Sequence, residues 1–223
     1  MIVKHCLISL VLMLIVSPVV NAQVQGLSIT DTAEPAGKGH TGIMGITIQN
    51  DKSSLYGGRI AYGVTERLLL FVDIGSYHVE YVSNGTDYSS TDIMGQAGVR
   101  YSLPMELPFD LSVRGTMIPY IANYEHYIEL TMGLHASRYL DASSNWAIYG
   151  YVGGVYQEWE LEFDLSPEQA AYTGQSTYMD IDDKTTFALA LGATRKLYGA
   201  TRLFVEIAHT DDYYGCAGIR YDF

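Results

Sequence analysis

The stretch Tyr213–Phe223, with the sequence YYGCAGIRYDF, decides the fold of this chain. Every second residue from Tyr213 onward is apolar or small, and the residues between them include Arg220 and Asp222. This period of two is that of a β-strand with one apolar and one polar face. The chain stops on an aromatic residue at the end of this strand, whereas the last residues of soluble domains commonly fray. The stretch therefore predicts a strand that separates an apolar medium from water.

The ending GIRYDF, Gly218–Phe223, resembles the last strand of the small Gram-negative outer-membrane β-barrel superfamily, which includes porin-like proteins. In that superfamily the last strand closes the barrel, and its terminal aromatic residue is part of the signal that the insertion machinery reads. The resemblance implies an insertion signal at Tyr221 and Phe223. It also implies an outer-membrane location, insertion by the barrel-assembly machinery, and contact with outer-membrane lipid and lipopolysaccharide.

Residues 1–22 are expected to be a cleaved signal peptide. Lys4 precedes the apolar run Cys6–Val20, and Val20-Asn21-Ala22 offers small residues where signal peptidase cleaves, ahead of Gln23. A transmembrane anchor is the alternative, but the run is short for a helical span, which needs about 20 apolar residues. Residues 23–41 are expected to be a periplasmic N-terminal stretch, and residues 42–223 to form one barrel domain.

The composition restricts the partners. The chain has 13 Lys+Arg against 25 Asp+Glu, a formal charge of -12. This balance argues against nucleic acid, because phosphate binding needs a basic surface. Removal of the signal leaves only Cys216, so no intramolecular disulfide can form. The mean hydropathy of +0.06 is typical of a soluble protein, but apolar and polar residues alternate in membrane strands and average out.

Ten segments follow period two and predict an all-β fold, a closed antiparallel transmembrane β-barrel. Short turns at 65–67, 104–108, 141–145 and 198–200 alternate with connections that are mostly longer and more polar, notably Ser83–Ser90 and Ser166–Asp183. This rhythm predicts short periplasmic turns and longer external loops. Eight strands would require leaving out the first hairpin, and a soluble β-sandwich would not explain the rhythm, the signal and Phe223 together. The expected strands are 42–49, 55–64, 68–82, 91–103, 109–119, 128–140, 146–163, 185–197, 201–210 and 214–223.

Charged residues within these apolar strands are expected to point into the barrel. An arginine on the lipid face at mid-membrane costs about 2–4 kcal/mol, and a register shift of one residue would place it there. Because a barrel of this size is narrow, side chains of both signs predict a plugged lumen held by ion pairs and hydrogen bonds. A solute path lined by the same residues is the alternative. The expected inward set is Arg59, Asp73, Arg100, Asp110, Arg114, Glu129, Lys196, Arg202, Glu206, Arg220 and Asp222.

Residues 158–183 are rich in carboxylates and contain no Lys or Arg. Carboxylate oxygens are ligands that Ca²⁺ and Mg²⁺ prefer, and such a cation would bridge to lipopolysaccharide phosphates. The segment Asp180–Asp183 lacks the glycine and the terminal glutamate of an EF-hand loop, and a solvated acidic loop without any cofactor is the simpler interpretation. The candidate ligands are Glu158, Glu160, Glu162, Asp180, Asp182 and Asp183.

Two groups of residues resemble catalytic sites. Outer-membrane lipid A deacylases use a histidine, a nearby serine and an acid, and here His135 and Ser137 share a strand face with Glu129. Omptin-like proteases use paired acids and a histidine near the external rim, as in His209 and Asp211–Asp212, although omptins are considerably longer chains. A buried structural histidine and a hydrogen-bonded turn account for the same residues. The expectation is a protein without catalytic residues.

Three functional hypotheses remain open. The leading one is a non-enzymatic, monomeric envelope protein with a structural or surface-interaction role and a plugged lumen. The second is a narrow channel or porin-like carrier for small solutes. The third is a lipid-modifying or proteolytic barrel enzyme.

Overall fold

Ten antiparallel strands pair into a closed barrel in a computed structural model of the chain, which describes residues 32–50, 53–83, 86–122, 125–141, 143, 145–162, 178–210 and 213–223. The predicted signal peptide lies outside these residues. Each strand pairs with its sequence neighbours, and the first strand pairs with the last, with Ile43 opposite Tyr221. The prediction of a closed ten-stranded barrel is confirmed, and the alternative of eight strands is wrong.

The ten strands are β1 Thr41–Gln49, β2 Ser53–Gly63, β3 Leu68–Ser83, β4 Thr86–Ser102, β5 Asp110–Ala122, β6 Glu125–Tyr139, β7 Trp146–Glu162, β8 Tyr178–Tyr198, β9 Thr201–His209 and β10 Tyr213–Asp222. No helix in the described part of the chain is long and apolar enough to cross a membrane.

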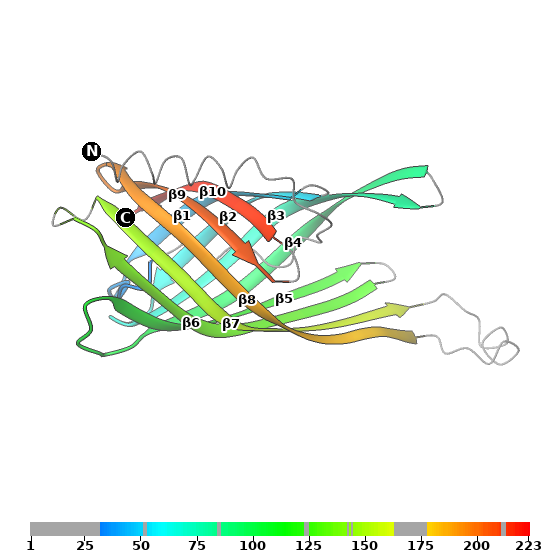
Figure 1. Ribbon diagram of the computed structural model, residues 1–223, viewed down its shortest axis with the longest axis horizontal. Helices are drawn as coiled ribbons and strands as arrows, with labels where there is room; N and C mark the ends of the chain where they lie inside the picture. Colours follow the sequence, from blue (N-terminus) through cyan, green and yellow to red (C-terminus); the bar gives the residue numbers. More distant parts are fainter. Residues whose placement is uncertain are drawn as a thin grey trace, which may run out of the picture.

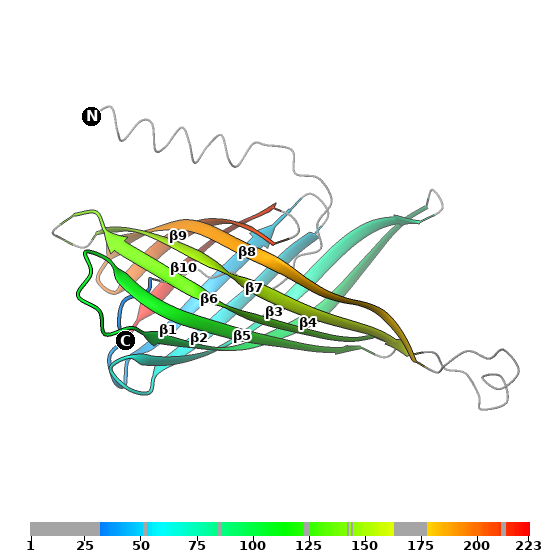
Figure 2. The ribbon, with the colours of Figure 1, turned by 60° about the horizontal axis from the view of Figure 1, so that its bottom comes forward.

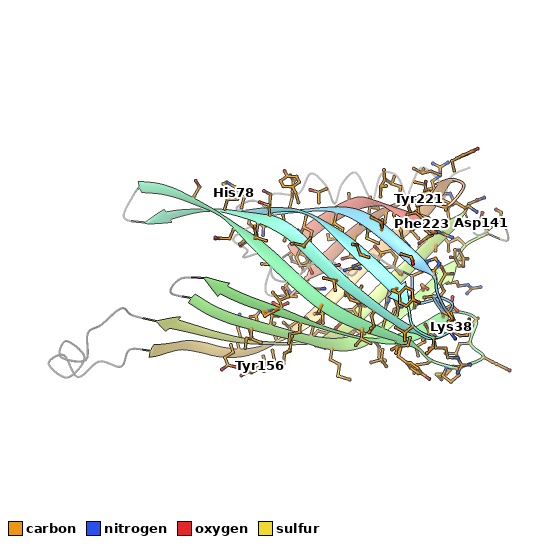
Figure 3. The ribbon with its side chains drawn as sticks, turned by 180° about the vertical axis from the view of Figure 1, so that it is seen from behind. Lys38, His78, Asp141, Tyr156, Tyr221 and Phe223 are labelled. Carbon is orange, nitrogen blue, oxygen red and sulfur yellow. The ribbon has the colours of Figure 1, made fainter. Side chains whose placement is uncertain are left out.

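The two ends of the barrel differ in shape. The short turns and the C-terminus lie at one end, which we call the turn end, and Figure 3 shows Asp141, Tyr221 and Phe223 there. At the opposite end the β3–β4 and β7–β8 hairpins extend beyond the other strands (Figures 1 and 2). Long hairpins therefore project from only one end of the barrel, which we call the extended end.

The predicted loops at this extended end are partly wrong. Ser83–Ser90 is not a loop, because β3 continues to Ser83 and β4 begins at Thr86. Likewise β8 begins at Tyr178, inside the predicted loop Ser166–Asp183. The physical reason is that a strand beyond the hydrocarbon meets water on its outer face, so it does not need the apolar alternation by which strands are recognised.

The ladder between β4 and β5 ends early. Its register runs from Ser102 opposite Ser112 to Ala97 opposite Met117. Continuing this register would place Pro119 opposite Gly95, and proline has no backbone N–H to donate to a ladder. The β3–β4 hairpin diverges from β5 and β6 beyond this point (Figures 1 and 2). Pro119 thus explains where the wall of the barrel separates.

The outside of the barrel is an apolar belt. Large apolar side chains stand exposed on successive strands, for example Ile93 at 73% and Met132 at 69% of their maximal area. Soluble monomers rarely expose a continuous apolar surface of this kind, whereas hydrocarbon solvates it. The belt includes Ile60, Val72, Ile74, Ile93, Val99, Met132, Val152, Leu191, Leu203 and Ile219.

The interior is filled by the alternate side chains. The inward residues of β2 to β6 include most of the buried charged and polar groups, and those of β1 and β10 are mostly apolar, such as Ile48 and Cys216. One expected inward residue is an exception, because Lys196 is exposed. Lys196 lies near the turn end of β8. Its position in the alternation puts it on the inner face of the strand, but it is past the enclosed part of the lumen and therefore stays exposed.

The first prediction concerns the apolar belt. Leu191 and Leu197 both face outward on β8, but only Leu191 lies far from the turn end. Leu191→Arg is expected to lower the free energy of unfolding in lipid vesicles by about 2–4 kcal/mol, and Leu197→Arg by about 0–1 kcal/mol, because the cost of a lipid-facing arginine depends on depth. Urea titrations of the two variants measure the difference. Equal, small losses would contradict the membrane placement.

Candidate functional site: the lumen and its N-terminal plug

An ion pair joins β2 and β3 inside the barrel. Arg59 and Asp73 are directly opposite in register, and both side chains are buried. The Arg59 Nε donates to Asp73 Oδ1 at 2.6 Å, and Nη2 donates to Oδ2 at 2.8 Å. From β4, the Gln96 Nε2 donates to the same Oδ2 at 3.1 Å. A bidentate pair with a further donor is the geometry in which a buried carboxylate and guanidinium stabilise each other best.

Two guanidinium groups lie close to one aromatic ring beside this pair. The Arg59 guanidinium carbon lies 4.4 Å from the centroid of Phe71, and that of Arg114 lies 4.8 Å from the same centroid. The electron-rich face of a ring attracts cations, so Phe71 stabilises both guanidinium groups. The ring occupies the space above Gly98, where any Cβ atom would overlap it.

Farther along the lumen, the polar groups of β5, β6 and β7 are also paired. Gln157 Nε2 donates to Glu129 Oε2 at 3.1 Å, and the hydroxyl groups of Thr116 and Thr131 share a hydrogen bond. His135 is fully buried, and its ring meets that of Tyr149 edge to face at a centroid distance of 5.8 Å. Side-chain contacts on the inner face thus join these neighbouring strands in addition to their backbone ladders.

The chain segment before β1 enters the lumen at the turn end. We call residues 32–40 the N-terminal plug. Arg100 on β4 donates through Nη1 to the Thr32 carbonyl and through Nη2 to the Glu34 carbonyl, the latter at 2.9 Å. The Ser102 hydroxyl donates to the Ala33 carbonyl at 3.2 Å. The lumen therefore binds the backbone of the chain itself.

The strand on the other side of β5, β6, holds the N-terminal plug as well. The Ala33 N–H donates to Ser137 Oγ at 2.8 Å, and the Tyr139 hydroxyl donates to Glu34 Oε2 at 2.6 Å. Thr32 and Ala33 are buried, Ala33 completely. Contacts from β4 and from β6, the two neighbours of β5, thus fix the segment to one part of the turn-end mouth.

The plug ends in a hydrogen-bonded group at β2 and β10. His40 Nε2 lies 3.1 Å from Asp222 Oδ1, and Arg220 Nε donates to the same oxygen at 2.6 Å. The Gly39 N–H donates to the Gly63 carbonyl at 2.8 Å. Gly39 has a φ of 79°, a left-handed conformation that glycine adopts without steric cost, and this lets the chain reverse into β1.

The N-terminal plug is a feature that the sequence pattern does not predict. Residues 23–41 are expected to be a stretch outside the barrel, whereas the described part, 32–40, makes at least six hydrogen bonds to barrel residues, from Arg100, Ser102, Ser137, Tyr139, Gly63 and Asp222. In the sheet, Arg100 lies opposite Leu69 on one side and Arg114 on the other, so no carboxylate is directly opposite it.

The other predicted lumen residues lie as follows. Glu206 is buried on β9, Asp110 is half-buried at the start of β5, and Arg220 joins the group at His40 and Asp222. The predicted insertion signal lies at the turn end, where the Tyr221 and Phe223 rings are exposed and meet edge to face at 4.9 Å.

The acidic segment is described only in part. Glu158 is half-buried and accepts a hydrogen bond from the Tyr156 hydroxyl at 3.3 Å. The backbone register places Glu158 opposite Asp183 and Glu160 opposite Asp180, which brings the two acidic runs side by side. The described residues contain no group of three His, Cys, Asp or Glu side chains that would hold a metal ion. The side chains outside the described residues are those of Glu160, Glu162, Asp180, Asp182 and Asp183.

Of the two groups that resemble catalytic sites, the first lies inside the lumen. His135 and Ser137 are buried in the lumen, and Ser137 Oγ accepts the Ala33 N–H of the plug. Glu129 accepts a hydrogen bond from Gln157. The third member, His135, meets the Tyr149 ring edge to face. The second candidate, Asp211–Asp212, lies outside the described residues.

A carboxylate organises the turn between β6 and β7. Asp141 accepts hydrogen bonds from the Ser143 hydroxyl at 2.5 Å and from the backbone N–H groups of Asn145 at 2.9 Å and Trp146 at 3.1 Å. The Ser143 hydrogen bond, followed by that of the Trp146 N–H, lowers the pKa of the Asp141 carboxyl below its ordinary value. The ionised form of Asp141 therefore favours the folded turn.

Comparison with known proteins gives a likeness in shape alone. No protein-family model matches the chain, and no curated protein matches it. Among solved structures, it is similar to the N-terminal β-barrel domain of Pseudomonas aeruginosa OprF, at 11% identity and a TM-score of 0.38, over 84% of this chain and 99% of that one. The KdgM porin is similar at 9% identity and 0.41, over 82% and 99%. Ail of Yersinia pestis is similar at 10% identity and 0.40, over 83% and 100%.

The architecture itself is that of an outer-membrane β-barrel. The ten strands are antiparallel and closed, so no sheet edge is left where β1 meets β10. An apolar belt covers the outside, and charged groups are enclosed. Closure and this distribution of side chains are what a sheet needs to exist in a bilayer. The outer membrane is the location that this fold specifies.

The second prediction concerns the pair between β2 and β3. Asp73→Ala leaves the buried Arg59 without its carboxylate, and this should lower the free energy of unfolding by about 3–5 kcal/mol. The double variant Arg59→Met/Asp73→Leu removes both charges and should lose much less. Urea unfolding in vesicles compares the two variants. A double variant as unstable as the single one would contradict the electrostatic origin of the loss.

The third prediction follows from the pKa of Asp141. A depressed carboxyl pKa contributes stability above the ordinary pKa of about 4, and this contribution is lost as the pH falls through the folded-state pKa. The stability gap between the wild type and Asp141→Asn should therefore be constant from pH 7 to pH 5 and shrink at pH 3. Urea midpoints at these three pH values measure the gap. A gap that widens in acid would refute the assignment.

Proposed function

We propose that the chain is a non-enzymatic, monomeric outer-membrane protein with a sealed lumen, and that its role is structural or surface-interacting. It needs no cofactor, and its partners are membrane lipid, lipopolysaccharide and the barrel-assembly machinery during insertion. The single observation that carries the proposal is the binding of the N-terminal plug. Arg100 uses two of its nitrogen atoms to hold plug carbonyls, so a guanidinium that would otherwise attract solutes is occupied.

The packing of the interior supports the same function. Asp73, Glu129 and His135 have almost no exposed surface. A residue that lines a water-filled path would keep contact with solvent, as the polar residues of wide porins do. Buried pairs such as Arg59 with Asp73 also stiffen the wall instead of presenting charges to a passing ion.

The shape of the extended end supports a surface role. The β3–β4 and β7–β8 hairpins project past the apolar belt on the side opposite the turns (Figures 1 and 2). Outer-membrane barrels have their longer connections outside the cell. The projecting hairpins are accordingly the part of this chain that other molecules at the cell surface meet first.

A narrow channel or porin-like carrier is the second candidate. The observation that favours it is the presence of both charge signs on the inward face, including Arg114 and Glu206. These residues would line a path if the N-terminal plug moved out of the turn-end mouth. The two candidates therefore differ in whether the plug stays in place.

The fourth prediction separates these candidates. The wild-type protein in planar bilayers should show no steady ionic conductance, because its lumen is filled. Heat-modifiable migration on a gel serves as the control that the barrel has folded. A stable conductance from folded protein would overturn the sealed lumen and favour the channel.

A labelling measurement extends this test to the plug. Ala33→Cys in a Cys216→Ser background should resist a bulky water-soluble maleimide, because Ala33 is completely buried. Adding Arg100→Ala should speed the labelling, because the plug then loses two hydrogen bonds. Rapid labelling with Arg100 intact would show that the plug does not stay in the lumen.

A further inference from the structure

We propose that two arginines and a tryptophan on the outer face of the turn end form a binding site for the headgroup of an anionic phospholipid. The residues are Arg138 on β6, Trp146 on β7 and Arg195 on β8. The inference rests on the proposed function, since it requires the barrel to stand in a membrane with its turn end in the periplasmic leaflet.

The sheet register brings the three side chains together. Trp146 is directly opposite Arg195, and the Arg195 guanidinium carbon lies 5.0 Å from the centre of the indole. Arg138 is opposite Ile148, two residues farther along the same face of β7. Diagonal neighbours in a sheet are about 7–8 Å apart, within reach of long side chains. One indole is therefore flanked by an arginine from each adjacent strand.

These arginines differ from those in the lumen. Arg138 and Arg195 are exposed, whereas Arg59, Arg100 and Arg114 are buried among partners. Within the described residues, neither Arg138 nor Arg195 joins an ion pair with a carboxylate. In a chain with a formal charge of -12, two adjacent cations without an acidic partner are a local excess that a negative ligand would neutralise.

The nearest acidic residue along the chain is not paired with either arginine. Asp141 follows β6 and keeps its negative charge, but its carboxylate accepts hydrogen bonds from Ser143, Asn145 and Trp146 and forms no ion pair with Arg138 or Arg195. The remaining outward neighbours are apolar, namely Leu140, Ile148 and Leu203. The two guanidinium groups thus stand at the edge of an apolar surface, and no carboxylate of the described residues forms an ion pair with them.

The surroundings define the class of the ligand. Half-exposed apolar and aromatic side chains around the arginines meet hydrocarbon, and indole rings prefer the boundary between hydrocarbon and headgroups. Arginines at this depth extend toward the headgroups, and their planar donors match phosphate oxygens. A phospholipid whose headgroup has a net negative charge, such as phosphatidylglycerol, fits this site. Its acyl chains meet the apolar side chains, and its phosphate meets the two arginines.

The test uses the fluorescence of Trp146. The chain has two tryptophans, so Trp159→Phe leaves Trp146 as the only indole. The variant is folded into phosphatidylcholine vesicles that contain a fixed fraction of either dibrominated phosphatidylglycerol or dibrominated phosphatidylcholine, since bromine quenches an indole that it contacts. Anionic lipid should be enriched about five-fold next to Trp146, as expected when a basic residue lies near anionic headgroups. High salt should reduce the enrichment.

Matched variants identify the residues. Arg138→Gln/Arg195→Gln should make the two brominated lipids quench equally, and Arg138→Gln alone, which keeps Arg195 over the indole, should reduce the preference in part. Arg67→Gln removes an exposed arginine from a different turn at the same end and should leave the preference unchanged.

Two outcomes overturn the proposal. One is equal quenching by both lipids in the folded parent, and the other is a preference that survives the double substitution. Heat-modifiable migration of each sample shows whether the barrel has inserted. Failure to insert would count against the proposed membrane function, whereas insertion without lipid preference would count against the headgroup site alone.

Discussion

Hydrocarbon cannot accept or donate hydrogen bonds, and this constraint determines the rest of the structure. Every backbone N–H and C=O group at membrane depth has to find a partner within the protein. The ladder between β1 and β10 meets this requirement where the two ends of the sheet join, with Gly42 opposite Asp222 and Gln49 opposite Gly215. Closure then divides the side chains into two populations. Those facing outward have to be apolar, and those facing inward have to satisfy one another in a narrow space.

The interior meets the second requirement by combining charge pairing with close packing. The Arg59–Asp73 pair balances two opposite charges, and the Phe71 ring makes cation–π contacts with the guanidinium groups of Arg59 and Arg114. Glycines provide the space for the rings. A Cβ atom at Gly192 would overlap Tyr149, and one at Gly218 would overlap Phe204. Arg100 has no acid opposite it in the sheet, and the N-terminal plug supplies carbonyl oxygens in place of a carboxylate. The first residues of the described chain are thus part of the electrostatic balance of the lumen.

The alternation in Tyr213–Phe223 and in the other strands predicted β-strands with one apolar and one polar face. Together with the signal, the terminal Phe223 and the rhythm of short turns and longer connections, it predicted a barrel of ten strands, with eight as the alternative. The same alternation assigned Arg59, Arg114 and Glu129 to the inner face, where the structure has them buried. It could not show which inward groups pair, since pairing depends on the register between strands. It also could not show the plug, because residues 32–40 have no period and most of their partners lie far away in the sequence, between 66 positions for Glu34 with Arg100 and 182 for His40 with Asp222. Beyond the membrane the pattern fails for a different reason, since β3 and β4 extend into water, where polar residues on both faces cost little.

The arginines show how one side chain serves opposite environments in this fold. Within the lumen a guanidinium is kept by neighbours that replace water, such as Asp73 for Arg59 and the plug carbonyls for Arg100. On the outer face such neighbours would themselves need a partner in hydrocarbon, so no carboxylate accompanies Arg138 or Arg195 within the described strands. These two arginines are confined to the turn end, where the side chains can extend to the headgroup layer. The outward arginines of the described strands have no carboxylate partner in the protein, and the inward arginines have several polar partners, for the same reason. A charge in this barrel needs a polar neighbour, and on the outer face the lipid has to provide it.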